Sequence, residues 1–279
     1  MAPAHSFSLA VTPLEVLDLE GNGFTHGTAF IYRVGGYPYL VTAWHVASGR
    51  NFFTRKLNPE AHIPNAFRVY APGFQQDGET VTLSSNAFTL DLTEDGVARL
   101  ESPPTVFGTP VDVAVGRLPI SSQKSGTFTS GGLNEFEWGI EERLASPIAS
   151  MIGADVFVLG YPLSTYEGLR TPIWKRGSLA SEPTFAIDPK CTFLIDVNST
   201  GGMSGGPIVR RVAIATALDQ ASDTIAETYD EAVIGVYSGR TLSGSDKGFS
   251  LGYGWPIDVV HAIIESGQCF SGPTDAETP

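Results

Sequence analysis

NSTGGMSGGP, the run from Asn198 to Pro207, is the most informative segment of this sequence. It sets one serine, Ser204, among glycines, which let a backbone adopt unusual dihedral angles and approach a bound molecule closely. A serine hydroxyl is a weak nucleophile by itself, so a catalytic role for Ser204 requires a histidine base and a carboxylate that orients the base. The segment therefore predicts a nucleophile with two partners elsewhere in the chain.

Candidates for both partners lie upstream. His45 follows the apolar run from Tyr39 to Trp44, which is typical of a buried strand, so we expect the imidazole at a rigid strand end. Asp112 interrupts the β-branched run VDVAV, where a buried carboxylate is costly without a partner that a histidine N–H could provide. Asp91 has a similar alternating apolar environment and is the rival acid.

The three segments together resemble the signature of the chymotrypsin/trypsin-like serine proteases. In family order they are T-A-x-H ending at His45, D-V-A beginning at Asp112, and G-x-S-G-G-P around Ser204. Weaker matches, G-Y-P at residues 160–162 and G-Y-G-W-P at residues 252–256, resemble disulfide-poor bacterial members of the HtrA type. No PDZ-like module follows, so the resemblance implies a stand-alone bacterial trypsin-like peptidase, similar to an HtrA protease domain without PDZ.

The resemblance implies a serine endopeptidase that works through an acyl-enzyme intermediate. Ser204 would attack a peptide carbonyl, His45 would take and return the proton, and Asp112 would orient His45. The N–H groups of Gly202 and Ser204 would form the oxyanion hole. The substrate pocket is expected at Asn198, Ser199, Ser238 and Gly239.

Two positions depart from the secreted enzymes of this family. Asn198 stands at the base of the pocket, so no carboxylate is expected to select Arg or Lys side chains. Met203 precedes the nucleophile where the secreted enzymes have an Asp that pairs with a new N-terminus. The zymogen switch is therefore absent, and we expect the oxyanion loop either to form unaided or to be ordered by a regulatory protein partner.

Two other function classes compete with this interpretation. Gly202 to Gly206 also fits the G-x-S-x-G elbow of α/β-hydrolases, but in that fold the histidine follows the serine. His261 is the only histidine that follows Ser204 in this sequence, but it lies in a predicted amphipathic closing helix and is expected to have a packing role. A catalytically silent scaffold with the same fold is the non-enzyme alternative.

The predicted fold is all-β, with two six-stranded antiparallel Greek-key barrels and a C-terminal helix, in one trypsin-like peptidase domain over residues 1–279. Short strands separated by turn-rich segments support it. The expected divisions are residues 1–120 for the first barrel, 121–150 for a linker, 151–256 for the second barrel, 257–266 for the helix and 267–279 for the tail. The cleft between the barrels would hold the site.

Composition narrows the setting. A net charge of -13 disfavours nucleic acid and an anionic membrane surface as partners. The resemblance implies a protein or peptide substrate. With two cysteines, Cys191 and Cys269, and no signal-like beginning, a cytoplasmic bacterial location is expected, although a mature form without its leader would look the same. No paired-cysteine or H-E-x-x-H motif occurs, so no metal or other cofactor is predicted.

Three further segments are not explained by the site. Residues 51–65 and 210–231 look like insertions that either gate the cleft, bind a partner or form acidic surface loops. The tail from residue 269 to residue 279 is expected to fray.

Overall fold

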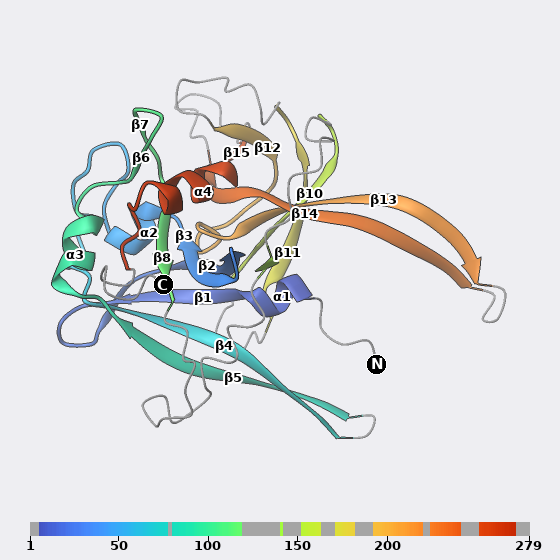
Figure 1. The fold of residues 1–279 in the computed structure, drawn as a ribbon, viewed down its shortest axis with the longest axis horizontal. Helices are drawn as coiled ribbons and strands as arrows, with labels where there is room; N and C mark the ends of the chain where they lie inside the picture. The colour runs from blue at the N-terminus through green and yellow to red at the C-terminus, as the bar shows by residue number, and fades with distance from the viewer. Residues whose placement is uncertain are drawn as a thin grey trace.

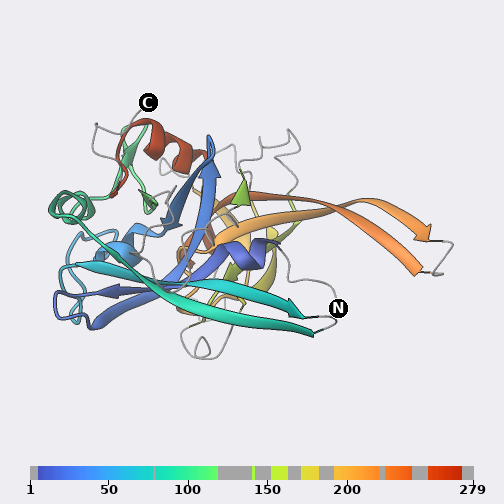
Figure 2. The same ribbon diagram turned by 60° about the horizontal axis from the view of Figure 1, so that its bottom comes forward.

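The computed structural model describes residues 6–77, 80–118, 140–141, 152–162, 171–181, 192–219, 224–240 and 251–271. Within these ranges the protein is built mainly of β-strands, arranged in two units that pack side by side, with four short helices at their margins (Figure 1). Two extended ribbons, one from each unit, project from this body (Figures 1 and 2).

The first unit is a seven-stranded sheet in which the strand order is β5-β4-β1-β2-β3-β8, with β9 paired in parallel to β2. Its long strands are apolar on the face that packs into the larger of two hydrophobic cores. The strands are β1 (Val11–Leu17), β2 (Gly23–Val34), β3 (Tyr37–Thr42), β4 (Ala66–Asp77), β5 (Thr80–Asp91), β8 (Ala114–Arg117) and β9 (Ile140–Glu141). A separate small hairpin joins β6 (Thr105–Val106) to β7 (Thr109–Pro110).

The strand β1 is difficult to recognise in the sequence because Pro13 interrupts its apolar run, and proline cannot donate to a sheet ladder. The structure accommodates Pro13 because pairing of β1 with β4 begins only at Leu14. On that side the N–H of Tyr70 donates instead to the hydroxyl of Thr12, over 2.8 Å. β1 can therefore pair with β2 along its whole length.

The second unit is a closed barrel of six antiparallel strands. Its core contains the fully buried Phe193, Ile195, Ile208 and Tyr237. The strands, in barrel order, are β10 (Asp155–Gly160), β11 (Ile173–Leu179), β12 (Phe193–Asp196), β15 (Gly252–Pro256), β14 (Thr224–Arg240) and β13 (Pro207–Asp219). The all-β fold class with two β units is confirmed; the second closes with six strands, whereas the first is the seven-stranded sheet.

The projecting ribbons are β4–β5 and β13–β14 (Figure 2). The expectation of an acidic surface loop over residues 210–231 is wrong, because β13 continues to Asp219 and β14 resumes at Thr224. Part of the reason is local neutralisation: Arg210 pairs with Asp230 at 2.5 Å, and Arg211 pairs with Glu231 at 3.0 Å across the same ladder. Two of the acidic residues that suggested a solvated loop, Asp230 and Glu231, are thus paired across a ribbon.

The helices are α1 (Ser6–Ala10), α2 (Trp44–Ser48), α3 (Glu94–Leu100) and α4 (Asp258–Glu265). Helix α4 matches the predicted closing helix and buries Val259, Val260 and Ile263. None of the helices in the described ranges is long and apolar enough to cross a membrane.

The start of the C-terminal tail is ordered against the first sheet. Phe270 donates its N–H to the carbonyl of Val115 at 2.8 Å, and the N–H of Arg117 donates to the carbonyl of Ser271 at 2.9 Å. Phe270 also packs edge-on against Phe67. The expected fraying is therefore wrong for residues 269–271. The predicted domain boundaries stay a prediction, and the linker over 121–150 lies outside the described residues except for β9.

Candidate active site

His45 is held by the short helix α2 and not by a strand end, because β3 stops at Thr42. Trp44, Val46 and Ala47 are almost fully buried and anchor the helix, whereas the His45 side chain is 29% exposed. The helix ends at Gly49, whose φ of 66° is the left-handed conformation that closes many helices. One turn of helix thus presents the imidazole at the surface of a rigid core.

The Asp112 carboxylate is fully buried and faces His45. One oxygen, Oδ1, accepts the backbone N–H of His45 at 2.8 Å, and the other, Oδ2, lies 2.7 Å from the ring Nδ1. The hydroxyl of Ser238 donates a short hydrogen bond to the same Oδ2. The rival acid Asp91 lies on the exposed side of β5 and pairs with Ala66. The structure therefore brings Asp112, and not Asp91, to the histidine.

This pairing sets the protonation of His45. Burial by itself would lower the pKa of His45, but the Coulombic attraction of Asp112 and its hydrogen bond outweigh burial and raise the pKa above the ordinary value. Because Nδ1 faces a carboxylate, the ring proton belongs on Nδ1 in the neutral form. The opposite nitrogen, Nε2, has no hydrogen-bond partner among the described residues and is available as a base.

Ser204 lies in the turn between β12 and β13, next to Gly205, whose φ is 88°. Its hydroxyl donates to the backbone carbonyl of Ser238 at 3.0 Å. Within the described part of the chain no hydrogen bond joins the Ser204 hydroxyl to His45. Ser204 and His45 are nonetheless linked through Ser238 and Asp112. The carbonyl of Ser238 accepts the Ser204 hydroxyl, and the hydroxyl of Ser238 donates to Asp112, which holds His45.

The two expected oxyanion donors lie on either side of the fully buried Met203. Neither the N–H of Gly202 nor that of Ser204 has an acceptor among the described residues, whereas the N–H groups of Met203, Gly205 and Gly206 are all hydrogen-bonded. Buried backbone N–H groups are rarely left unpaired. Gly202 is buried and has a φ of 92°, so the loop presents two free donors at the nucleophile.

The expected pocket residues are placed unevenly. Ser238 is buried at a bulge of β14, where the register against β15 shifts between Tyr237 and Gly239. Ser199 is buried and its hydroxyl forms a short hydrogen bond with the phenol of Tyr237, while Asn198 is exposed. Their role in specificity stays a prediction.

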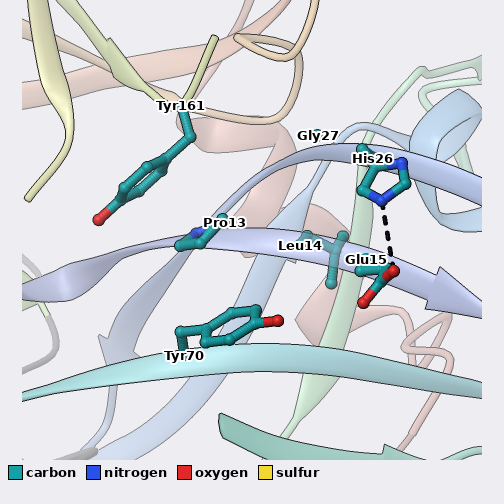
Figure 3. A pocket seen from close by; sticks show the side chains of 7 residues that line it. All are labelled: Pro13, Leu14, Glu15, His26, Gly27, Tyr70 and Tyr161. Carbon is teal, nitrogen blue, oxygen red and sulfur yellow. Dashed lines mark ion pairs between the residues drawn. The ribbon is translucent and has the colours of Figure 1, made fainter. Parts of the chain in front are cut away.

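A small, open hollow lies where the two units meet (Figure 3). Tyr161, at the end of β10, faces strands β1, β2 and β4 of the first sheet across it. His26 and Glu15 form an ion pair on its wall, with Nε2 and Oε1 3.3 Å apart. The residues that line it are Pro13, Leu14, Glu15, His26, Gly27, Tyr70 and Tyr161.

Arg55 is a neighbour of the site that the sequence did not indicate. Its guanidinium lies over the rings of Trp44, at 5.5 Å, and Phe52, at 4.4 Å. Burial lowers the pKa of Arg55, and attraction to Asp112 partly offsets this. The insertion that carries Arg55 therefore packs beside the histidine. Cation–π geometry depends on folding, and no local pattern announces it.

The described residues contain no cluster of three or more His, Cys, Asp or Glu side chains that could hold a metal ion. Cys269 is a free thiol, and its burial raises its pKa to about 11, so it is poorly reactive at neutral pH. Cys191 lies outside the described residues. His261 is half-buried and packs on Tyr32, with its Nε2 3.3 Å from the phenol oxygen, as expected for a packing residue of the closing helix.

Neither the models of known protein families nor the curated proteins contain a match to this chain. Among solved structures, the fold is similar to that of Deg5, with a TM-score of 0.48 and 14% identity over 95% of this chain and 92% of that chain. It is also similar to the active form of the Rv3671c protease from M. tuberculosis, with a TM-score of 0.46 and 18% identity over 94% of this chain and 82% of that chain. Such likeness concerns the fold alone, so the chemistry of the site rests on its own residues.

Proposed function

We propose that the protein is a serine endopeptidase that hydrolyses peptide bonds through Ser204, His45 and Asp112. The observation that carries this proposal is the buried Asp112 carboxylate, which holds both the backbone and the ring of His45 and shares Ser238 with the nucleophile. A buried charge is costly unless it is fully hydrogen-bonded. Three convergent donors at one carboxylate, beside a partly exposed imidazole, are the arrangement that orients a general base.

The reaction begins when the Ser204 hydroxyl turns from the Ser238 carbonyl towards Nε2 of His45, a rotation between staggered side-chain positions. As Ser204 attacks the peptide carbonyl, Nε2 takes its proton and the imidazolium is stabilised by Asp112. The oxyanion accepts hydrogen bonds from the free N–H groups of Gly202 and Ser204. His45 then returns the proton to the leaving amine, and water releases the acyl group by the same steps.

The substrate is a protein or peptide that lies along β14 near Ser238 and Gly239. Asn198 offers a neutral polar group to the substrate side chain, so a strong preference for Arg or Lys is not expected. The acidic overall charge fits this substrate class better than nucleic acid. A bacterial cytoplasmic setting, with a protein partner that restrains or orders the site, completes the proposal.

A second candidate is a fold of the same kind that is silent until a partner binds. It is favoured by one observation, the Ser204 hydroxyl engaged with Ser238 and not with His45. In this state the nucleophile is not activated. Rotation of one side chain separates the two candidates, and that rotation costs little unless the surroundings oppose it.

The test is cleavage of a mixed peptide library by the purified chain beside its Ser204→Ala variant. The proposal expects cleavage by the wild type, none by Ser204→Ala, and equal thermal unfolding of both. Cleavage that survives in Ser204→Ala would contradict the assignment. Cleavage that appears only after a cell extract is added would favour the partner-gated candidate.

A further inference from the structure

Thr28 lies on β2 at the contact between the two units and is fully buried. It follows Gly27, which Figure 3 shows on the first-sheet side of the junction, across from Tyr161 of the second unit. It pairs with Pro13 of β1, and its hydroxyl contacts Gly202 and Tyr161, so its side chain is on the face of the sheet that looks towards the barrel. A buried polar side chain at such a contact must be hydrogen-bonded.

Every polar group of Thr28 is used, and the partners lie on both units. Its N–H donates to the carbonyl of Ser204 at 2.9 Å, and its hydroxyl donates to the carbonyl of Gly202 at 2.7 Å. The same hydroxyl accepts the N–H of Tyr161 at 3.0 Å, and the carbonyl of Thr28 accepts the hydroxyl of Thr42 at 2.7 Å. One residue thus connects the first sheet to the nucleophile loop and to the end of β10.

The two carbonyls that Thr28 holds belong to the same residues whose N–H groups are free. Each of these carbonyls shares a planar peptide unit with the N–H of the next residue, Met203 or Gly205, so holding both leaves the segment between them few rotations. The N–H of Gly206 also holds the carbonyl of Met203, at 3.1 Å. That carbonyl shares its peptide unit with the N–H of Ser204, so this donor is fixed in direction, and the N–H of Gly202 begins a segment whose next three carbonyls are all held.

The neighbouring backbone is shaped to allow this approach. A Cβ atom at Gly160 would lie 2.8 Å from the hydroxyl oxygen of Thr28. A Cβ atom at Gly205 would lie 2.1 Å from the carbonyl oxygen of Thr28, and its φ of 88° also favours glycine. Both glycines let the second unit come within hydrogen-bond distance of β2.

We infer that Thr28 is a positioning residue, which through its hydroxyl holds the Gly202 and Ser204 donors in the geometry that receives the oxyanion. The inference rests on the proposed function, since it names what sets the donors of that same site. It predicts that the hydroxyl acts on the transition state, where the oxyanion exists, and little on substrate binding.

The test compares Thr28→Ser with Thr28→Ala, two variants that both lack the methyl group and differ by one oxygen. The assay uses the fastest-cleaved peptide of the library and a boronic acid built on the acyl half of that peptide, whose tetrahedral adduct places an oxygen in the hole. Thr28→Ser should retain kcat within about threefold. Thr28→Ala should lower kcat by at least about tenfold and leave KM within about threefold. The loss in kcat should be smaller than the roughly 10²- to 10³-fold that is typical when an oxyanion donor is removed outright.

The matched control is Thr12→Ala. Thr12 is also a buried strand threonine whose hydroxyl donates to a carbonyl, that of Pro13 at 2.9 Å, and accepts an N–H, that of Tyr70 at 2.8 Å. It makes no bond to the nucleophile loop within the described part of the chain. Thr12→Ala should lower thermal stability about as much as Thr28→Ala and leave kcat unchanged.

The boronic acid separates positioning from general destabilisation. Its affinity should fall in Thr28→Ala by the same factor as kcat/KM, while Thr28→Ser binds it like the wild type. Equal kcat in Thr28→Ser and Thr28→Ala, or a loss of kcat in Thr12→Ala as large as in Thr28→Ala, would overturn the inference. A wild type that cleaves no peptide would instead overturn the proposed function on which the inference rests.

Discussion

Replacing Asp112 by asparagine tests the hydrogen-bond logic of the site, because an amide matches the shape of the carboxylate but not its acceptors. Three donors converge on Asp112: the backbone N–H of His45 at Oδ1, and the ring Nδ1–H and the Ser238 hydroxyl at Oδ2. An asparagine side chain has one acceptor oxygen and one NH₂ group. The NH₂ group must therefore take the place of Oδ1 or Oδ2, where it faces groups that are themselves hydrogen-bond donors.

Only one orientation of the introduced amide avoids that conflict. If the amide oxygen accepts the His45 N–H, the NH₂ group faces Nδ1 and the Ser238 hydroxyl, and both can become acceptors. Nδ1 can accept only when the ring proton moves to Nε2, and Nε2 then cannot take the proton of Ser204. The structure thus predicts the wrong tautomer, for which the cost in kcat is about 10⁴-fold, or about 5 kcal/mol.

Stability should change far less than activity, because the substitution also removes a buried charge and leaves every polar group paired. The assay is the rate of peptide cleavage, with thermal unfolding measured in parallel. Asp91→Asn, at the exposed acid on β5, is the control and should match the wild type in both. Asp112→Asn with activity within about tenfold of the wild type, or Asp91→Asn with an equal loss, would refute this reasoning.

Three further outcomes follow from the same geometry. Because the pKa of His45 is raised, kcat/KM should rise with pH through a value above 6.5. The stability that His45 adds should be complete below pH 6.5 and should disappear as the pH rises through the raised pKa. The difference in unfolding free energy between the wild type and His45→Gln, measured across pH, checks this. A His45→Gln penalty that grows with pH would contradict it. Ser238→Ala removes a hydrogen bond to a charged group and should cost roughly 10- to 100-fold in kcat/KM, from about 1.5–3 kcal/mol for such bonds; unchanged kinetics would count against a role in orienting Asp112. Gly205→Ala should prevent folding, since its Cβ would meet backbone at 2.1 Å, whereas Gly36→Ala, with a similar φ of 83° and open space, should cost only about 1–2 kcal/mol by chemical denaturation; equal losses would show that crowding is not the cause.

Motif order indicated the pairing of His45 with Asp112, but not the local structure that presents them. His45, Asp112 and Ser204 are separated by long stretches of chain, and only their flanking residues identified them. The apolar run before His45 suggested a strand to the histidine itself, yet the chain turns into helix α2 after Ala43, where the first helical N–H groups bond back to its carbonyl. Short helices of this kind depend on tertiary packing, which periodicity does not reveal.

Thr28 shows what a single sequence does not reveal. A threonine between Gly27 and an apolar run looks like any residue of a buried strand. Its importance arises from partners more than 130 positions away, at Tyr161 and Gly202. The ribbon β13–β14 was missed for a related reason, since two of its acidic residues, Asp230 and Glu231, pair with Arg210 and Arg211 only after the strands align.

The most direct test of the central claim is reaction of the purified chain with a fluorophosphonate, followed by mapping of the adduct by mass spectrometry. Ser204 should carry a single adduct, and His45→Ala should abolish it while the protein stays folded. An unmodified wild type, or an adduct on a serine other than Ser204, would contradict the claim that Ser204, His45 and Asp112 form one reactive site.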